Sequence, residues 1–163
     1  MDQNLPLHNT CEIGRLRKVL LHRPGRELEN LMPEYLERLL FDDIPYLKLA
    51  QEEHDRFADT LRQCGAEVLY LTDLTAEAVA EDEVRRRFIR DYLSEAGVVS
   101  DRVRGILTEY FSSLSAKALV EQMAAGVRKS ELQQLEKTRL SDLTAFGEED
   151  YPFLVDPMPN LYF

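Results

Sequence analysis

Apolar residues fall into two short runs and one long helical stripe over the first 74 residues. A strand is predicted over 17–22, where Val19-Leu20-Leu21 is apolar, and Arg23-Pro24-Gly25 ends it with turn chemistry. A helix is predicted over 46–63, because apolar residues recur there at steps of three or four: Leu47, Ala50, Phe57, Leu61 and Cys64, with His54 on the same stripe. We expect Cys64 in the core and Gly65 just after the helix. A second strand over 67–71 completes a unit typical of a mixed sheet covered by helices.

A short helix is predicted between these elements, from Pro33 through Leu40, and the sequence Asp-Asp-Ile-Pro at 42–45 ends it. The carboxylates of Asp42 and Asp43 have two interpretations. They could approach a bound cation, or they could cap the helix that begins near Tyr46. We favour the cap.

Residues 75–147 show only helical periodicity, and no strand is predicted in them. One helix is expected from Thr75 to Ala96, a second after Ser100, a third from Ser115 to Gly126, and a fourth from Ser130 towards Leu140. Short helices with apolar stripes predict a compact bundle inserted between two pieces of sheet. The run Arg85-Arg86-Arg87 lies among acidic residues, which indicates a solvated, salt-bridged helix face.

The last residues predict a third strand over 153–155 and then a rigid segment. Pro157 and Pro159 fix the backbone and remove two donors, so we expect neither helix nor central strand there. An extended segment that carries an amide, Asn160, and two aromatic rings, Tyr162 and Phe163, suits the wall of a small-molecule pocket.

Composition narrows the classes of partner. The 163 residues include 44% hydrophobic residues, enough for a core, and carry a net charge of −10, which disfavours nucleic acid. No apolar run approaches the roughly 18 residues that cross a membrane, and the first residues do not form a signal peptide, so we expect a cytoplasmic protein. Two cysteines, Cys11 and Cys64, make neither a disulfide framework nor a metal site. His22 and His54 lie outside any arrangement that specifies catalysis, so we expect them to be structural.

Two sets of motifs carry a resemblance to a known family. Residues 156–163, DPMPNLYF, resemble the segment that runs into a Thr-Arg-Asp-Pro sequence in arginine deiminases. Residues 12–26 (EIGRLRKVLLHRPGR), 29–31 (ENL) and 39–45 (LLFDDIP) are similar to the opening strand and loops of the same enzymes, which belong to the pentein, or guanidine-modifying, superfamily. Since family members are more than twice as long, the chain resembles their N-terminal part only.

The resemblance implies an α/β fold: a partial pentein-type propeller with an inserted all-α bundle. Its parts would be a first propeller module at 1–74, a helical domain at 75–148, and a return strand with a substrate-site segment at 149–163. It also implies hydrolysis of L-arginine to L-citrulline and ammonia through a cysteine-linked intermediate, without a metal or an organic cofactor. By the same resemblance, Asn160 contacts the α-carboxylate of the substrate and Phe163 lies beside its guanidinium group.

The catalytic cysteine, histidine and acidic residues of the family would all lie beyond residue 163. We therefore expect no catalytic residue within this chain and no activity from it alone. The alternative roles for Asn160 and Phe163 are a turn residue and core packing, respectively. The alternative function is a truncated, non-catalytic homologue that acts as a binding or assembly module. We expect a homo-oligomer, or a chain that depends on the C-terminal part.

Overall fold

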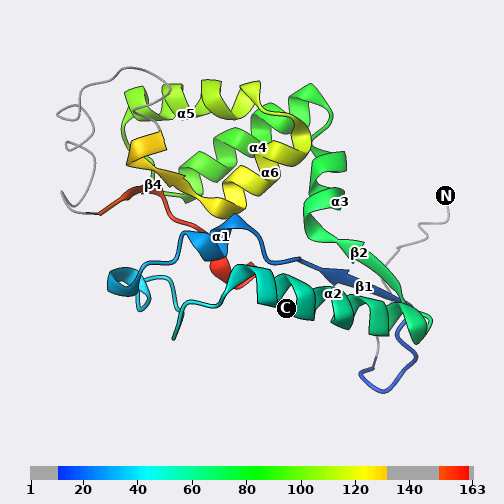
Figure 1. The fold of residues 1–163 in the computed structure, drawn as a ribbon. Helices are drawn as coiled ribbons and strands as arrows, with labels where there is room; N and C mark the ends of the chain where they lie inside the picture. The colour runs from blue at the N-terminus through cyan, green and yellow to red at the C-terminus, as the bar shows by residue number, and fades with distance from the viewer. Residues whose placement is uncertain (1–10, 132–150, 162–163) are drawn as a thin grey trace.

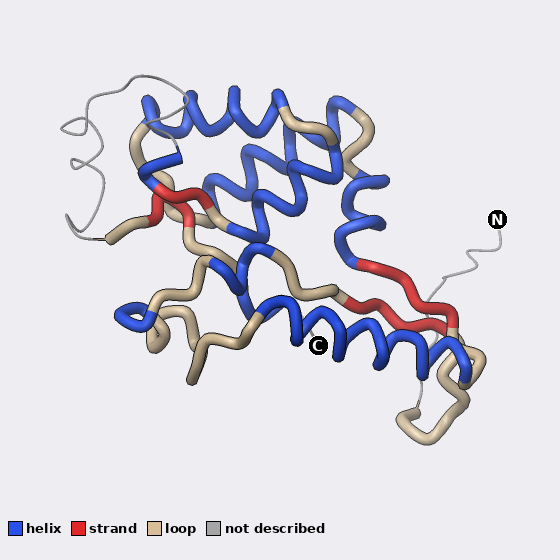
Figure 2. The backbone as a smooth tube through the Cα atoms, in the orientation of Figure 1, coloured by secondary structure: helices blue, strands red, loops and turns tan. Residues whose placement is uncertain are grey.

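The computed structural model describes residues 11–131 and 151–161, and Figure 1 shows two packed parts. One part contains the strands β1 (Lys18–Leu21) and β2 (Glu67–Tyr70), with helix α2 (Leu47–Gln63) lying along them. The other part is a helical bundle, reached through α3 (Leu71–Ala78) and built from α4 (Asp82–Glu95), α5 (Asp101–Ser113) and α6 (Ala116–Ala125). The mixed α/β class is confirmed, with helices dominating the described chain (Figure 2).

The first sheet forms as its sequence predicts. β1 and β2 pair in parallel from Lys18 opposite Glu67 to Leu21 opposite Tyr70, and α2 is the crossover that a parallel pair requires. The stripe of α2 was placed less accurately by the sequence. Cys64 is exposed rather than buried, because it follows the last turn of the helix, and the side chain of Phe57 is 50% exposed. Ala58 is the residue of α2 that is fully buried.

The bundle confirms its predicted caps and corrects one helix. The hydroxyl of Ser100 accepts a hydrogen bond from the Val103 amide at the start of α5, and the hydroxyl of Ser115 accepts one from the Ala118 amide at the start of α6. The single helix expected over 75–96 is instead two helices, α3 and α4. The chain turns at 79–81, where the side chain of Val79 is buried in the core and two acidic residues begin α4, a favourable position for negative charge.

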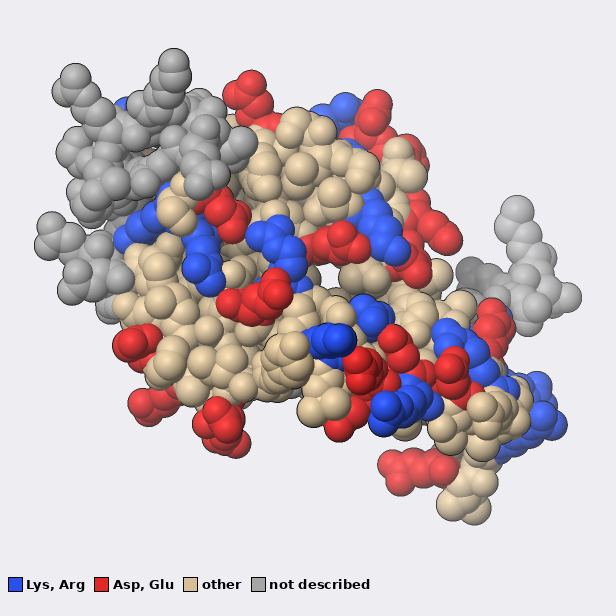
Figure 3. All heavy atoms as spheres, in the orientation of Figure 1, with Lys and Arg blue, Asp and Glu red and all other residues tan. Residues whose placement is uncertain are grey.

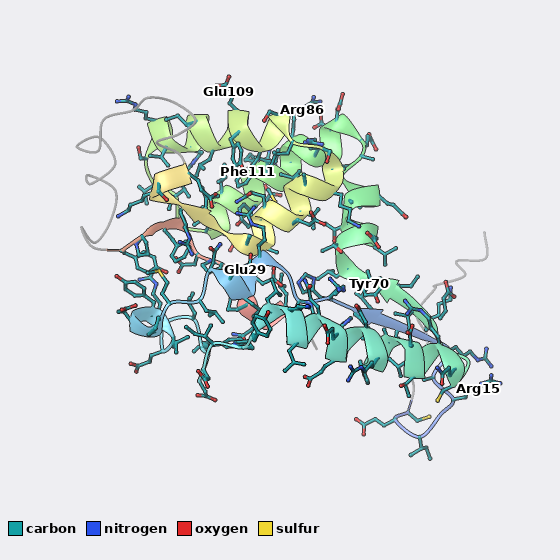
Figure 4. All side chains as sticks on the ribbon, in the orientation of Figure 1. Arg15, Glu29, Tyr70, Arg86, Glu109 and Phe111 are labelled. Atoms are coloured by element: carbon teal, nitrogen blue, oxygen red, sulfur yellow. The ribbon has the colours of Figure 1, made fainter. Side chains whose placement is uncertain are left out.

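Buried apolar residues fill the bundle. Phe111 lies inside it in Figure 4, whereas Arg86 and Glu109 point outward. The ring of Phe111 contacts those of Tyr92 and Tyr110 at centroid distances of 5.7 and 5.5 Å. Arg86 pairs with Glu83, as the predicted salt-bridged face requires. Arg85 does not belong to that face, because its guanidinium donates to the carbonyl oxygens of Phe111, Ser112 and Leu114. It therefore satisfies carbonyls at the end of α5.

The bundle also contains a strand that the sequence did not predict. Val127 and Arg128 form β3, which pairs antiparallel with β4 (Phe153–Val155), so β4 joins this second sheet rather than β1 and β2. The helix expected from Ser130 begins at residue 129, and Leu132, Leu135 and Leu140 lie outside the described residues. Within 11–131 and 151–161, no helix has the length and apolar character needed to cross a bilayer.

Direct contacts join the two parts. Helix α1 (Arg26–Glu29) ends at Asn30. The side-chain nitrogen of Asn30 donates to the Ala125 carbonyl, and its side-chain oxygen accepts a hydrogen bond from Arg128. The segment after β4 is held against the end of α6, since the Met158 amide donates to the Ala124 carbonyl at 2.8 Å. Contrary to expectation, this segment contains a 3-10 turn at Pro159–Leu161, which proline tolerates at its first position.

Candidate functional site

Two segments that are distant in sequence meet at a hollow of about 490 Å³. One is the loop after the first helical turns, residues 40–45, and the other is the 3-10 turn at Pro159–Leu161. The hollow is lined by Leu40, Phe41, Asp42, Asp43, Ile44, Pro45 and Asn160. Of the two predicted substrate-binding residues, Asn160 therefore lies at a cavity, whereas Phe163 is outside the described residues.

The loop begins with a backbone conformation that costs energy. The Phe41 amide donates to the Leu36 carbonyl and the Leu40 amide to the Glu37 carbonyl, the hydrogen bonds of a Schellman motif. The same pair of bonds ends α2 at Gly65 and α4 at Gly97, both glycines with positive φ. At the hollow the left-handed position is filled by Leu40, with φ of 57°, at a cost of about 1–2 kcal/mol. Strain of this kind is found at functional sites, and the Leu40 side chain is 80% exposed.

The two acidic residues of the loop do not cap α2. Its N-cap position is Tyr46, and no side chain there accepts a hydrogen bond from the helix. Asp43 instead accepts a hydrogen bond from the neighbouring Ile44 amide at 2.7 Å, and both carboxylates are exposed at the hollow. The cap interpretation was therefore wrong. Because their charges face a cavity, the two carboxylates favour a cationic group within it.

Asn160 reaches across to the loop. Its side-chain nitrogen donates to the Leu39 carbonyl at 3.1 Å, which joins residues 121 positions apart, rather than to its own turn. An amide nitrogen carries two hydrogens, so the second can still be donated to a ligand, and the amide oxygen can accept. The motif at 156–163 predicted a role for this residue. The loop opposite it was indicated by the family resemblance of residues 39–45 and by the acidic pair Asp42 and Asp43, but not as a partner of Asn160.

A second cavity, of about 550 Å³, lies between the first sheet and the bundle. Its walls include His22, Glu27, Arg23, Asp55, Lys117 and Asp73. Most of these groups bind one another: Arg23 pairs with Asp55 at 2.7 Å, and Lys117 with Asp73 at 2.8 Å. Figure 3 shows basic and acidic side chains intermingled along this boundary. Tyr70, labelled in Figure 4, lies on the same boundary at the end of β2.

Of the two histidines expected to be structural, His22 is buried and lines this second cavity, and His54 is a half-buried residue whose side chain is 8% exposed. The Nε2 atom of His22 lies 2.9 Å from the carboxylate of Glu27, which also accepts a hydrogen bond from the Gly25 amide at 2.5 Å. Burial lowers the pKa of His54, and the hydrogen bond from Arg23 lowers the pKa of Asp55. Neither cysteine lines either of these two cavities, and both are exposed. Among the described residues, no group of three or more His, Cys, Asp or Glu side chains is arranged to hold a metal.

Known proteins match this chain along its whole length. The model of the arginine deiminase family matches residues 37–163. An arginine deiminase of Clostridium perfringens is 56% identical over 165 residues, and those of Streptococcus agalactiae and Streptococcus uberis are each 51% identical. All of this chain is covered in these comparisons, but the chain spans only 39–40% of the length of the relatives. The match of the family model to more than half of the residues shows that the chain belongs to the arginine deiminase family.

Proposed function

We propose that this chain contributes part of the substrate site of an arginine deiminase, which hydrolyses L-arginine to L-citrulline and ammonia. The observation that carries the proposal is the meeting of Asn160 with the acidic loop at 40–45 in one hollow. Relatives that are 51–56% identical over the whole chain bear the name of this enzyme, which supports the substrate.

The chemistry of the hollow suits a molecule with charges of both signs. Arginine carries an α-carboxylate, an α-ammonium group and a planar guanidinium cation. The free amide hydrogen of Asn160 is suited to donate to the carboxylate, while Asp42 and Asp43 attract the cationic groups. We propose that Phe163 adds a ring face beside the guanidinium.

The reaction also needs groups that the described residues do not bring to this hollow. The guanidinium carbon is resonance-stabilised and therefore requires a strong nucleophile such as a thiolate, together with a histidine that protonates the leaving ammonia. The residues that line the hollow include neither a cysteine nor a histidine. We therefore propose that this chain supplies binding, and that a purified 163-residue chain forms no citrulline.

The finer architecture belongs to the same proposal. The parallel pair β1–β2 with α2 supports a first propeller module at 1–74, and the helices from α4 to α6 support a helical domain at 75–148. We propose that 149–163 returns to the propeller as its substrate-site segment. Exposed apolar side chains at Leu40, Tyr46 and Leu49 support association with a further chain or with C-terminal propeller modules. Light scattering after size-exclusion chromatography tests self-association of the 163-residue chain, and a well-behaved monomer would exclude the homo-oligomer.

The function is tested in a chimera. Residues 1–163 of this chain replace the matching region of the Clostridium perfringens relative, and citrulline formation from L-arginine is measured. We expect an active enzyme. A chimera that unfolds cooperatively but forms no citrulline would refute the proposed function.

The role of Asn160 is tested in the same chimera by Asn160→Ala. Losing a hydrogen bond to a charged group costs about 1.5–3 kcal/mol, so KM for L-arginine should rise roughly 10- to 100-fold with kcat little changed. Gln63→Ala, which removes an exposed amide at the end of α2, is the control. Equal KM values for the two variants would remove Asn160 from the binding site.

A further inference from the structure

Three side chains, from residues close in sequence to the segments that form the hollow, make a mutually bonded cluster. Arg38 donates from Nε to one carboxylate oxygen of Asp156 at 3.2 Å, and the hydroxyl of Tyr151 donates to the other oxygen at 2.6 Å. The guanidinium carbon of Arg38 also lies 4.1 Å from the ring centroid of Tyr151, in cation–π geometry. Each member therefore contacts both of the others.

The position of this cluster in the chain is more informative than its composition. Arg38 precedes the strained Leu40 by two residues, and Asp156 precedes Asn160 by four. The cluster thus joins the parts of the chain that lead into the two segments of the hollow, through Arg38 and Asp156, which are 118 positions apart. The hydrogen bond from Asn160 to the Leu39 carbonyl is a second link between these parts of the chain. Pro157 and Pro159 lie between these links and restrict the backbone that connects Asp156 to Asn160.

Global stability does not explain the cluster. The side chains of Arg38 and Asp156 are 49% and 41% exposed, and an ion pair of that exposure contributes about 0–1 kcal/mol. Tyr151 is buried, with its ring edge-on to that of Tyr35 at 4.9 Å, so its hydroxyl requires the partner that Asp156 provides. Burial and this hydrogen bond both raise the pKa of Tyr151, which keeps the hydroxyl protonated as a donor.

We propose that Arg38, Asp156 and Tyr151 are positioning residues, which fix the loop at Leu40 relative to Asn160 and so set the affinity for the carboxylate end of the substrate. This inference rests on the proposed function for its substrate. Contacts that bind ground state and transition state equally change KM and leave kcat unchanged. A cluster that only aligns two binding segments should show this signature.

The chain offers a matched control. Arg62 is also an exposed arginine, paired with Asp59 at 2.8 Å and placed over the ring of Tyr70 at 5.9 Å, but it lies on α2 away from the hollow. In the chimera described above, Arg38→Ala and Asp156→Ala should each raise KM for L-arginine about tenfold with kcat within about twofold. The double variant should raise KM by no more than the larger single effect, since both remove one network. Arg62→Ala should leave both constants unchanged.

Tyr151→Phe is the milder variant, since it keeps the buried ring and removes only the hydroxyl. It should raise KM in the same direction by a smaller factor. KM values equal to those of Arg62→Ala, or a fall in kcat with KM unchanged, would overturn the positioning role. If the unsubstituted chimera forms no citrulline, the proposed function fails first.

A second test of the positioning role does not depend on catalytic activity. In the isolated 163-residue chain, Asp156→Ala should speed hydrogen exchange of the Asn160 side-chain amide at least fivefold, because its bond to Leu39 loses its support, whereas Arg62→Ala should not. Unchanged exchange in Asp156→Ala would overturn the inference independently of catalysis.

Discussion

The buried carboxylate of Glu27 holds the turn that leads from β1 into α1, and its removal is the most informative test of the fold. Glu27 is 2% exposed and accepts two hydrogen bonds, from the Gly25 amide and from His22, which is itself 2% exposed. A Cβ at Gly25 would lie 2.7 Å from the Glu27 carboxylate, so a larger residue there would displace that side chain. The φ of Gly25, −125°, is ordinary, so the constraint is close approach rather than backbone conformation.

Glu27→Ala leaves two donors without this partner, the buried His22 ring and the half-buried Gly25 amide. Each unsatisfied group costs about 1–3 kcal/mol, and breaking a buried pair by removing one member costs about 3–5 kcal/mol. We therefore expect the free energy of unfolding to fall by about 3–5 kcal/mol. With an m-value near 2 kcal/mol per M, the midpoint of urea denaturation should fall by roughly 2 M. Glu27→Gln keeps an acceptor for the Gly25 amide, so it should cost about half as much.

The control for this experiment is on the same short helix. Glu29→Ala removes an exposed carboxylate from α1, and its expected effect is within about 0.5 kcal/mol. Urea denaturation followed by circular dichroism measures all three variants. If Glu27→Ala and Glu29→Ala unfold at midpoints within about 0.3 M of each other, then the Glu27 carboxylate does not stabilise this turn and the reasoning is refuted.

Four further substitutions test the packing of the bundle and the pH dependence of stability. Gly126→Ala should destabilise the fold by at least about 2 kcal/mol, because φ is 75° and a Cβ would lie 2.6 Å from the Pro157 nitrogen. Gly105→Ala, which adds a Cβ in open space within α5, should instead stabilise it by about 0.5–1 kcal/mol. Similar Tm values for the two variants would contradict this reasoning. Phe111→Ala should cost about 3–5 kcal/mol in urea denaturation, since the ring is fully buried, and a loss below about 1 kcal/mol would show that the bundle collapses around the gap. Burial lowers the pKa of His54, so on acidification the unfolded chain takes up a proton at this residue before the folded chain does. The contribution of neutral His54 to the free energy of unfolding is therefore complete above about pH 6.5 and is lost as pH falls below that value. His54→Gln should therefore reduce the loss of stability between about pH 7.5 and 5.5, and an unaltered slope would contradict the assignment.

Several features of this protein are determined within a few residues of sequence. The strands at β1 and β2, the helix α2, the serine caps of α5 and α6, and the end of α6 at Gly126 all agree with sequence patterns. Caps and helix ends are local because the hydrogen bonds that satisfy them join residues three to five positions apart. Family membership was also readable, since the motifs at both ends are contiguous.

Other features depend on the path of the chain. Packing between helices explains two of them. Val79 is buried, which divides the helix expected over 75–96, and Arg85 donates to a carbonyl of α5 and so leaves the solvated face. The strand β3 has only two residues, so no periodicity predicts it, and it exists because β4 lies beside it. Cys64 falls on an apolar stripe but lies past the last turn of α2, where it is exposed.

The candidate site divides in the same way. The sequence by itself placed Asn160 in a Pro-bounded segment and, through its motif, predicted a ligand-binding role for its amide. Only the tertiary structure decided that the amide meets the loop at 40–45, that Leu40 takes a left-handed conformation there, and that Asp42 and Asp43 face the hollow instead of capping α2. The physical reason is distance along the chain: these contacts join residues 118 and 121 positions apart, so they depend on how the first sheet, the bundle and the segment after β4 pack together.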